Sequence, residues 1–155
     1  MLFRRISRSD PEKIFVVAKN SWSTASLTNG QAVDWDYSSE ANGVAVTKPT
    51  ARTASLAGLS GAGIVAETIA ADAYGLIQVY GYHSAVRVRA NTTANTVVAG
   101  AALVFSPTAA AFCLEPLFTA TATSTIVFAF PLAFALGTYS SWTTTTIAAF
   151  VKAMG

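Results

Sequence analysis

The sequence predicts an all-β protein: a single compact β-sandwich or barrel of short antiparallel strands, with an extended N-terminal arm and at most one or two short helices. Three observations predict this class. Short apolar runs recur at intervals of roughly ten residues. Turn residues such as Asn-Gly separate the runs. Valine, isoleucine, threonine and aromatic residues, which favour strands, fill them. A sandwich and a barrel share this pattern, so both remain open.

The chain of 155 residues is expected to form one β domain over residues 13–155, preceded by an arm over residues 1–12. In the arm, apolar residues alternate with arginines, and the sequence RSDPEK then interrupts regular structure. The single cysteine, Cys113, excludes an internal disulfide. A domain of this length is large enough to bury a core without such a crosslink.

The first strand is expected over residues 13–19, where the apolar run of KIFVVAK is bounded by lysines. Asn29-Gly30 is a strong tight-turn signal. Because Leu27 and Val33 flank this turn, we expect a hairpin there.

Asn42-Gly43 predicts a second turn, which leads into a strand over residues 44–48 that Pro49 ends. The following segment is rich in alanine and glycine and fits two structures. A strand over residues 63–70 is preferred, and a helix over residues 64–73 is the alternative.

Two strands are expected within the aromatic stretch AYGLIQVYGYHSAVRV. Residues 75–81 are apolar on both faces and predict a strand buried on two sides. Residues 85–91 alternate valine with arginine and predict a half-buried strand.

Further short strands are expected after Arg89, where Glu115 is the only charge before Lys152. The final segment is threonine-rich and is expected to begin as a strand, with a terminal helix over residues 147–153 as the alternative. The other strands are expected within residues 97–105, 111–118, 124–130 and 132–137.

Residues 117–136 carry no charge and have about the length of a membrane-spanning helix. Several threonines and Pro131 interrupt this segment, and no lysine or arginine flanks it. We therefore expect no membrane association.

The residues predict no catalytic, cofactor or metal site. His83 is the only histidine, and with Cys113 it falls short of the ligands that a zinc site needs. Asp34 and Asp36 are two residues apart near Glu40 and would share one face of a strand. The simpler interpretation is a polar strand face with the intervening Trp35 turned toward the core.

Charge is scarce: charged residues make up 12% of the chain and hydrophobic residues 52%, whereas soluble domains average about 25% charged. Such a surface is expected to be covered by other subunits. Tyrosine supplies rigid contact area at low entropic cost. We therefore predict a subunit interface at Tyr74, Tyr80, Tyr82 and His83.

The runs EKIFVVAKNS, LTNGQAVDWDY, NGVAVTKP and AGIVAETIAADAYGLIQVYGYHSAVRV, followed by VVAGAALV and the ending FPLAFALG…IAAFVKAMG, resemble a family of small head proteins of tailed bacteriophages. The resemblance spans residues 13–155. This sequence departs from the family pattern at FCLEPLF and in its alanine- and phenylalanine-rich tail.

The resemblance implies a capsid decoration, or cement, protein that binds the outer surface of the phage head and stabilises contacts between capsomers. The implied partners are the major capsid protein and two further copies of this chain, in a homotrimer, with no direct contact to nucleic acid. The implied location is the virion, after assembly in the host bacterial cytoplasm. The arm residues Phe3, Arg4, Arg5 and Arg8 would clamp onto the shell.

Two alternatives remain. One is a tail or fibre-base component of the same virion. The other is a glycan-acting enzyme that uses Asp34, Asp36 and His83.

Overall fold

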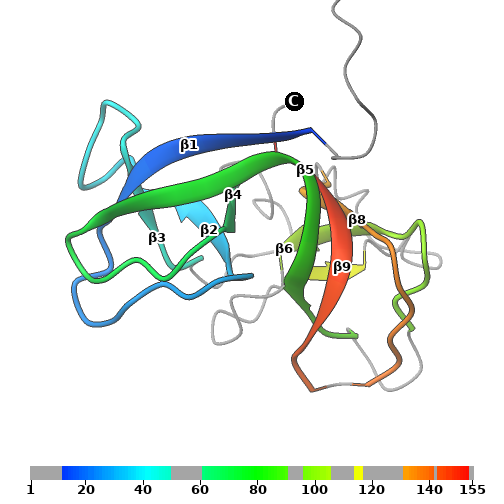
Figure 1. The fold of residues 1–155 in the computed structure, drawn as a ribbon. Helices are drawn as coiled ribbons and strands as arrows, with labels where there is room; N and C mark the ends of the chain where they lie inside the picture. Colours follow the sequence, from blue (N-terminus) through cyan, green and yellow to red (C-terminus); the bar gives the residue numbers. More distant parts are fainter. Residues whose placement is uncertain are drawn as a thin grey trace, which may run out of the picture.

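The computed structural model describes residues 12–49, 61–90, 96–105, 114–116, 131–141 and 143–153. These residues form an all-β fold without a helix, which confirms the predicted class (Figure 1). The strands in chain order are β1 (Lys13–Asn20), β2 (Ala32–Trp35), β3 (Ala45–Thr47), β4 (Gly61–Val65), β5 (Tyr74–Val88), β6 (Ala102–Phe105), β7 (Leu114–Pro116), β8 (Ala133–Ala135) and β9 (Thr145–Lys152).

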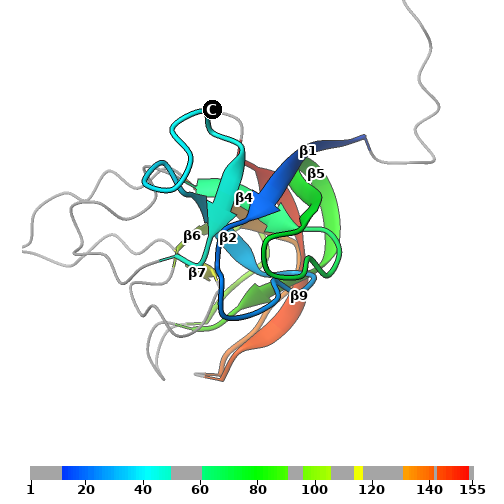
Figure 2. The ribbon, with the colours of Figure 1, turned by 90° about the vertical axis from the view of Figure 1, so that its left-hand side faces the viewer.

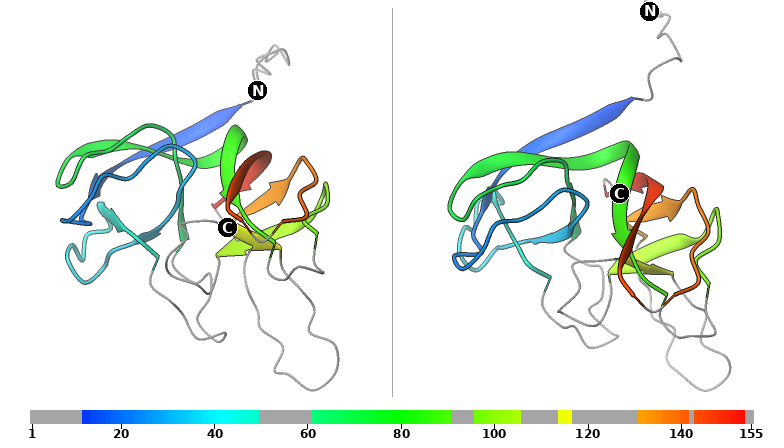
Figure 3. Two further views of the ribbon diagram at one scale, coloured as in Figure 1. Left: turned by 90° about the horizontal axis from the view of Figure 1, so that it is seen from below. Right: turned by 60° about the horizontal axis from the view of Figure 1, so that its bottom comes forward.

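The strand pairings close the sheet on itself, so the protein is a barrel rather than a sandwich. The first ring runs β1-β3-β2-β4-β5 and returns to β1. A second ring runs β5-β7-β6-β8-β9 and returns to β5. Figure 3 shows the two rings side by side. Pairing is antiparallel, as expected, except between β1 and β3 and between β5 and β7, which are parallel.

Both rings share β5, which is 15 residues long. Its first half pairs with β1 and β4, and its second half pairs with β9. In Figure 1 the strand runs beside β1 and then turns down beside β9. Gly81 lies where the pairing of the strand passes from β1 to β9, and its φ of 99° is a conformation that glycine adopts without strain. The two strands expected within residues 75–91 are therefore one strand, because glycine lets the backbone bend without ending the ladder.

Each ring encloses its own hydrophobic core. Ile77 and Leu27 belong to the core of the first ring, and Leu103 and Val88 belong to that of the second. Strands β2 and β4 separate the cores, because their successive side chains point to opposite faces. The large, fully buried members of the first core are Leu27, Val33, Val46, Val65, Ile69 and Ile77; those of the second are Ile64, Val86, Val88, Val97, Leu103 and Leu114.

The expected strands over residues 13–19, 44–48 and 132–137 are confirmed as β1, β3 and β8. The strand expected within 97–105 begins only at Ala102, although Val97 forms an isolated bridge with Tyr139. Residues 124–130, most of 111–118 and the arm residues 1–11 lie outside the described residues.

Both helical alternatives were wrong. Residues 145–152 form β9, and β4 ends at Val65, well short of the strand expected to reach residue 70. Ile69 instead exchanges two backbone hydrogen bonds with Leu27, each 2.9 Å long. The turn at Asn29-Gly30 is present, but the hairpin expected there was wrong, because Leu27 pairs with Ile69 and not with Val33.

We expect Gly30→Ala to destabilise the fold strongly. Gly30 has a φ of 83°, its N–H donates to Val65 O, and its own carbonyl accepts from Arg87 N. An added methyl group would overlap the carbonyl oxygen of Ala85 in β5. Conformational strain should lower the free energy of unfolding by about 1 kcal/mol. Overpacking should lower it by a further amount of about 1–3 kcal/mol. Chemical denaturation measures the sum.

Gly100→Ala is the matched control. Gly100 has nearly the same backbone conformation, with a φ of 87°, but open space around the added methyl group. Only the strain of about 1 kcal/mol should remain. Equal losses of stability in the two variants would contradict the close packing of Gly30 against β5.

Candidate docking surface

An apolar patch lies on the outer face of β1 and the first part of β5. We define the apolar patch as Phe15, Val17, Tyr74 and Leu76, whose exposed fractions are 40%, 64%, 64% and 37%. Val17 lies directly opposite Leu76 in the antiparallel ladder, and Tyr74 lies opposite Lys19. The four side chains therefore form one continuous surface. Seen from the side of the first ring, β1 and β5 form its outer margin (Figure 2).

The sequence of β1 explains why this face is apolar. Successive side chains of a strand point to opposite faces. Val16 and Ala18 face the core of the first ring together with Ile77 of β5. Because Ile14 to Ala18 are all apolar, the residues between the core positions carry apolar side chains outward. The expectation that residues 75–81 are buried on both faces was therefore wrong at Leu76.

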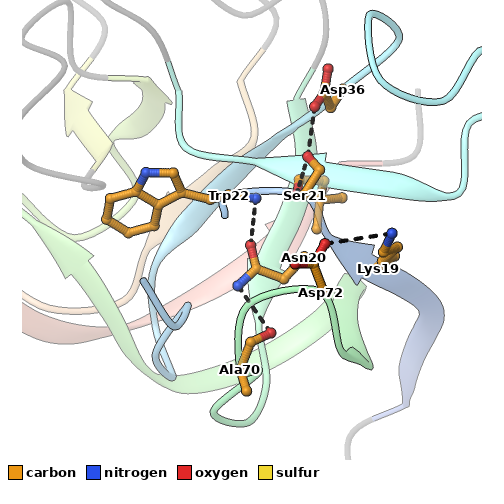
Figure 4. Close-up of polar contacts among 8 residues, drawn as sticks. Lys19, Asn20, Ser21, Trp22, Asp36, Ala70 and Asp72 are labelled. Carbon is orange, nitrogen blue, oxygen red and sulfur yellow. Dashed lines mark hydrogen bonds and ion pairs between the residues drawn. The ribbon is translucent and has the colours of Figure 1, made fainter. Parts of the chain in front are cut away.

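Buried polar groups fix the end of the first ring next to the apolar patch (Figure 4). Asn20 is fully buried at the end of β1. Its Nδ2 donates to the carbonyl oxygens of Ala25, Ile69 and Ala70 at 3.1, 3.1 and 3.2 Å. Its Oδ1 accepts from the Trp22 N–H at 2.9 Å. One side chain thus joins the end of β1 to two loops.

A second polar group joins the same region to the loop after β2. The Ser21 hydroxyl donates to Asp36 Oδ2 at 2.6 Å (Figure 4). The Ser38 hydroxyl and the Ser39 N–H donate to Asp36 Oδ1. Hydrogen bonds hold the pKa of Asp36 well below its ordinary value. The bond from Ser21 has the largest effect, and those from Ser38 and Ser39 lower the pKa further. The carboxylate therefore serves as a structural acceptor.

The turn before β5 presents Tyr74. Asp72 has a φ of 61°, and its N–H donates to Asn20 O at 2.9 Å. Its carboxylate forms an ion pair with Lys19 at 3.6 Å (Figure 4). Both side chains are partly exposed, so the pair contributes little to stability. Its consequence is local: the charge of Lys19 at the margin of the apolar patch already has a partner.

The structure places the four predicted interface residues along β5 in different surroundings. Tyr74 is exposed in the apolar patch. Tyr80 is half-buried and packs edge-on against Phe150, with ring centroids 5.1 Å apart. Tyr82 is half-buried, with Lys13 Nζ 5.9 Å from its ring centroid. His83 is 7% exposed. Their role in subunit contacts stays a prediction, and Phe3, Arg4, Arg5 and Arg8 lie outside the described residues.

His83 is buried within the chain near the bend of β5. Its Nδ1 accepts the backbone N–H of Ala85 at 3.1 Å, so this nitrogen carries no proton. Burial lowers the pKa of His83, and the charge of Lys13 acts in the same direction, while a hydrogen bond with the backbone of Val65 opposes them. The neutral ring is the form that fits the fold.

The two acidic residues near β2 lie in different surroundings. Asp34 is 2% exposed within β2, so the expected polar strand face was wrong at this position. Asp36 lies beyond the end of β2 and accepts hydrogen bonds from the serines described above. Within the described ranges no group of histidine, cysteine, aspartate or glutamate could hold a metal ion. Cys113 lies outside those ranges.

Sequence reasoning missed Phe15, Val17 and Leu76. A signal for them was present, because an apolar run without alternation in a short strand must turn some apolar side chains outward unless both faces are covered. The pattern of residues 13–19 predicts a strand but does not by itself identify which side chains face outward.

We expect Asn20→Asp to lower the free energy of unfolding by roughly 3 kcal/mol or more. The new carboxylate would face three carbonyl oxygens that now accept from the amide. Asn42→Asp makes the same chemical change at an exposed turn position and should stay within about 0.5 kcal/mol of the wild type. Thermal or urea unfolding of both variants compares them. A small loss at position 20 would show that its amide does not organise this end of the ring.

We expect the stability of the fold to fall as the pH drops below about 6.5, the ordinary pKa of histidine. Since the pKa of His83 is lowered in the folded state, the unfolded chain takes up the proton first. Stability is full above this pH and falls by up to about 1.4 kcal/mol per pH unit until the folded-state pKa is passed. His83→Asn keeps an acceptor and removes the titration. Urea unfolding between about pH 7.5 and 5 measures the free energy of unfolding of both proteins. This free energy should depend less on pH in the variant than in the wild type. The same pH dependence in both would exclude His83 as the cause.

The part of the chain that the structure describes holds no helix with the length and hydropathy needed to cross a membrane. No protein-family model matches the chain, and no curated protein matches it in sequence.

Proposed function

We propose that this chain is a structural, non-enzymatic protein of a bacteriophage virion: a decoration protein that binds the outer surface of the head as a trimer and stabilises contacts between capsomers. The single observation that carries the proposal is the apolar patch on β1 and β5. Its four members are each more than a third exposed and lie together on two paired strands of the sheet.

The composition supports a protein covered by neighbours. With 12% charged residues, the chain has few groups that keep an isolated surface hydrated. Contiguous exposed apolar surface on a folded protein usually marks an interaction site. Tyrosine and phenylalanine, both present in the apolar patch, are enriched in such interfaces.

The resemblance of residues 13–155 to small phage head proteins supplies the identity of the neighbours in this proposal: the major capsid protein and further copies of the chain. Three copies held together would bind the shell far more tightly than one, because the second and third contacts become intramolecular. Phe3, Arg4, Arg5 and Arg8 precede β1 in the sequence and would add further contacts to the shell.

Purified protein is expected to bind undecorated phage heads and to raise the temperature at which they break. Tyr74→Ser should weaken this binding by about tenfold or more, because exposed aromatic anchors dominate interface energies. Tyr37→Ser is the matched control: Tyr37 is 57% exposed, against 64% for Tyr74, but lies outside the apolar patch. The affinity of Tyr37→Ser for undecorated heads should stay within about twofold of the wild-type value.

Co-sedimentation with heads measures the affinities, and light scattering on the free protein measures the copy number. A wild-type protein that does not bind heads, or binds them without strengthening them, would end the proposal. Equal losses from Tyr74→Ser and Tyr37→Ser would remove the apolar patch from it.

A further inference from the structure

Strand β1 has an open edge. One edge pairs with β5 from Lys13 to Lys19, but on the other edge only Lys19 and Asn20 pair, with Ala45 and Val46 of β3. No strand in the described part of the chain pairs with this second edge between Lys13 and Ala18. In Figure 1, β1 runs along the upper side of the sheet, with no described strand above it.

The backbone groups on the open edge can be assigned from two hydrogen bonds. Asn20 N donates to Ala73 O on the β5 side, and Lys19 N donates to Val44 O on the opposite side. Because successive residues of a paired strand direct their N–H and C=O groups to alternate edges, Lys13, Phe15 and Val17 direct theirs away from β5. A strand added here would find a regular row of donors and acceptors.

The side chains of this segment are exposed on both faces of the sheet. Ile14, Phe15 and Val17 have exposed fractions of 36%, 40% and 64%. An apolar strand with an open edge and no proline is a template for pairing with another chain. Since Phe15 and Val17 also belong to the apolar patch, an added strand would extend that surface.

The charges at the ends of β1 decide which chain can pair. Lys13 and Lys19 bound the strand. Lys19 is paired with Asp72, whereas no carboxylate among the described residues lies within ion-pair distance of Lys13. A second copy of β1 would bring lysine opposite lysine, both in an antiparallel pair centred on Val16 and in a parallel pair in register. Like charges directly opposite each other oppose pairing.

We propose that the open edge of β1 binds an extended segment of a different protein, which adds as a strand, places apolar side chains at alternate positions, and carries an aspartate or glutamate at the end beside Lys13. This inference deepens the proposed function and rests on it for the partner's identity, a protein of the phage shell. Backbone hydrogen bonds supply the affinity in this mode of binding, and the side chains supply the specificity.

Val17→Pro tests the edge. Proline removes the N–H that faces the open edge but no hydrogen bond to β5, and edge strands tolerate it. Val17→Thr is the matched control, since it also changes the exposed side chain but keeps the N–H. We expect Val17→Pro to weaken binding to undecorated heads by at least about tenfold and Val17→Thr by less than about threefold. Circular dichroism checks that both variants fold.

A second measurement does not depend on proline being tolerated. The probe is a synthetic peptide of about eight residues, alternating valine and threonine, with glutamate at both ends. We expect it to bind the full chain at least about tenfold more tightly than the same peptide ending in lysines. Hydrogen exchange should show protection of the Phe15 and Val17 amides on binding. Methylation of the backbone nitrogens that face β1 should abolish binding.

Three outcomes would overturn the inference. The first is equal head binding by folded Val17→Pro and Val17→Thr when the wild-type protein binds heads. The others are equal binding of both peptides and unprotected Phe15 and Val17 amides in the presence of the peptide. Amides already protected in a self-associated free protein would place a second copy on the edge and would also overturn it. Failure of the proposed function is distinguishable. The glutamate-ended peptide would then bind β1 while the wild-type protein binds no heads.

Discussion

The bend in β5 is the constraint on which the rest of the structure depends. A single strand of 15 residues provides a wall for both rings, so both hydrophobic cores are built on one continuous backbone. Gly81 permits the bend, and Gly30 lets a neighbouring turn approach the second half of the strand closely enough to bond with Arg87. A side chain at either glycine would meet backbone atoms. The two rings therefore rely on glycine positions where no Cβ fits.

The apolar patch follows from this arrangement. Strand β1 buries only alternate side chains in the core of the first ring, through Val16 and Ala18. Its other side chains face outward, where the first half of β5 adds Tyr74 and Leu76 to the same surface. Covering apolar surface contributes about 25 cal/mol for each Å² removed from water. The apolar side chains that the core leaves exposed on this sheet therefore favour association with another protein.

Hydrogen bonds hold the surroundings of the apolar patch in place, and this bears on binding. Asn20, Ser21 and Asp36 fix the loops at one end of β1 through hydrogen bonds to backbone and side-chain groups. A surface held in place before binding loses little conformational entropy when a partner covers it. The scarcity of charge also favours binding, because few solvated ionic groups must lose their water when a partner covers the surface. Composition, sheet geometry and polar anchoring together favour a protein that works by contact.

The sequence by itself determined the class of fold and the positions of several strands, because strand propensity and turn residues act locally. It also indicated a surface that must be covered, since composition alone limits how much charge that surface can carry. Only the tertiary structure decided that residues 74–88 form one bent strand, that Leu27 pairs with Ile69, and that Phe15, Val17 and Leu76 lie beside Tyr74. Those outcomes depend on which strands become neighbours and on which strand faces are buried in the two cores. Such choices are made between residues far apart in the chain, where local patterns carry no information.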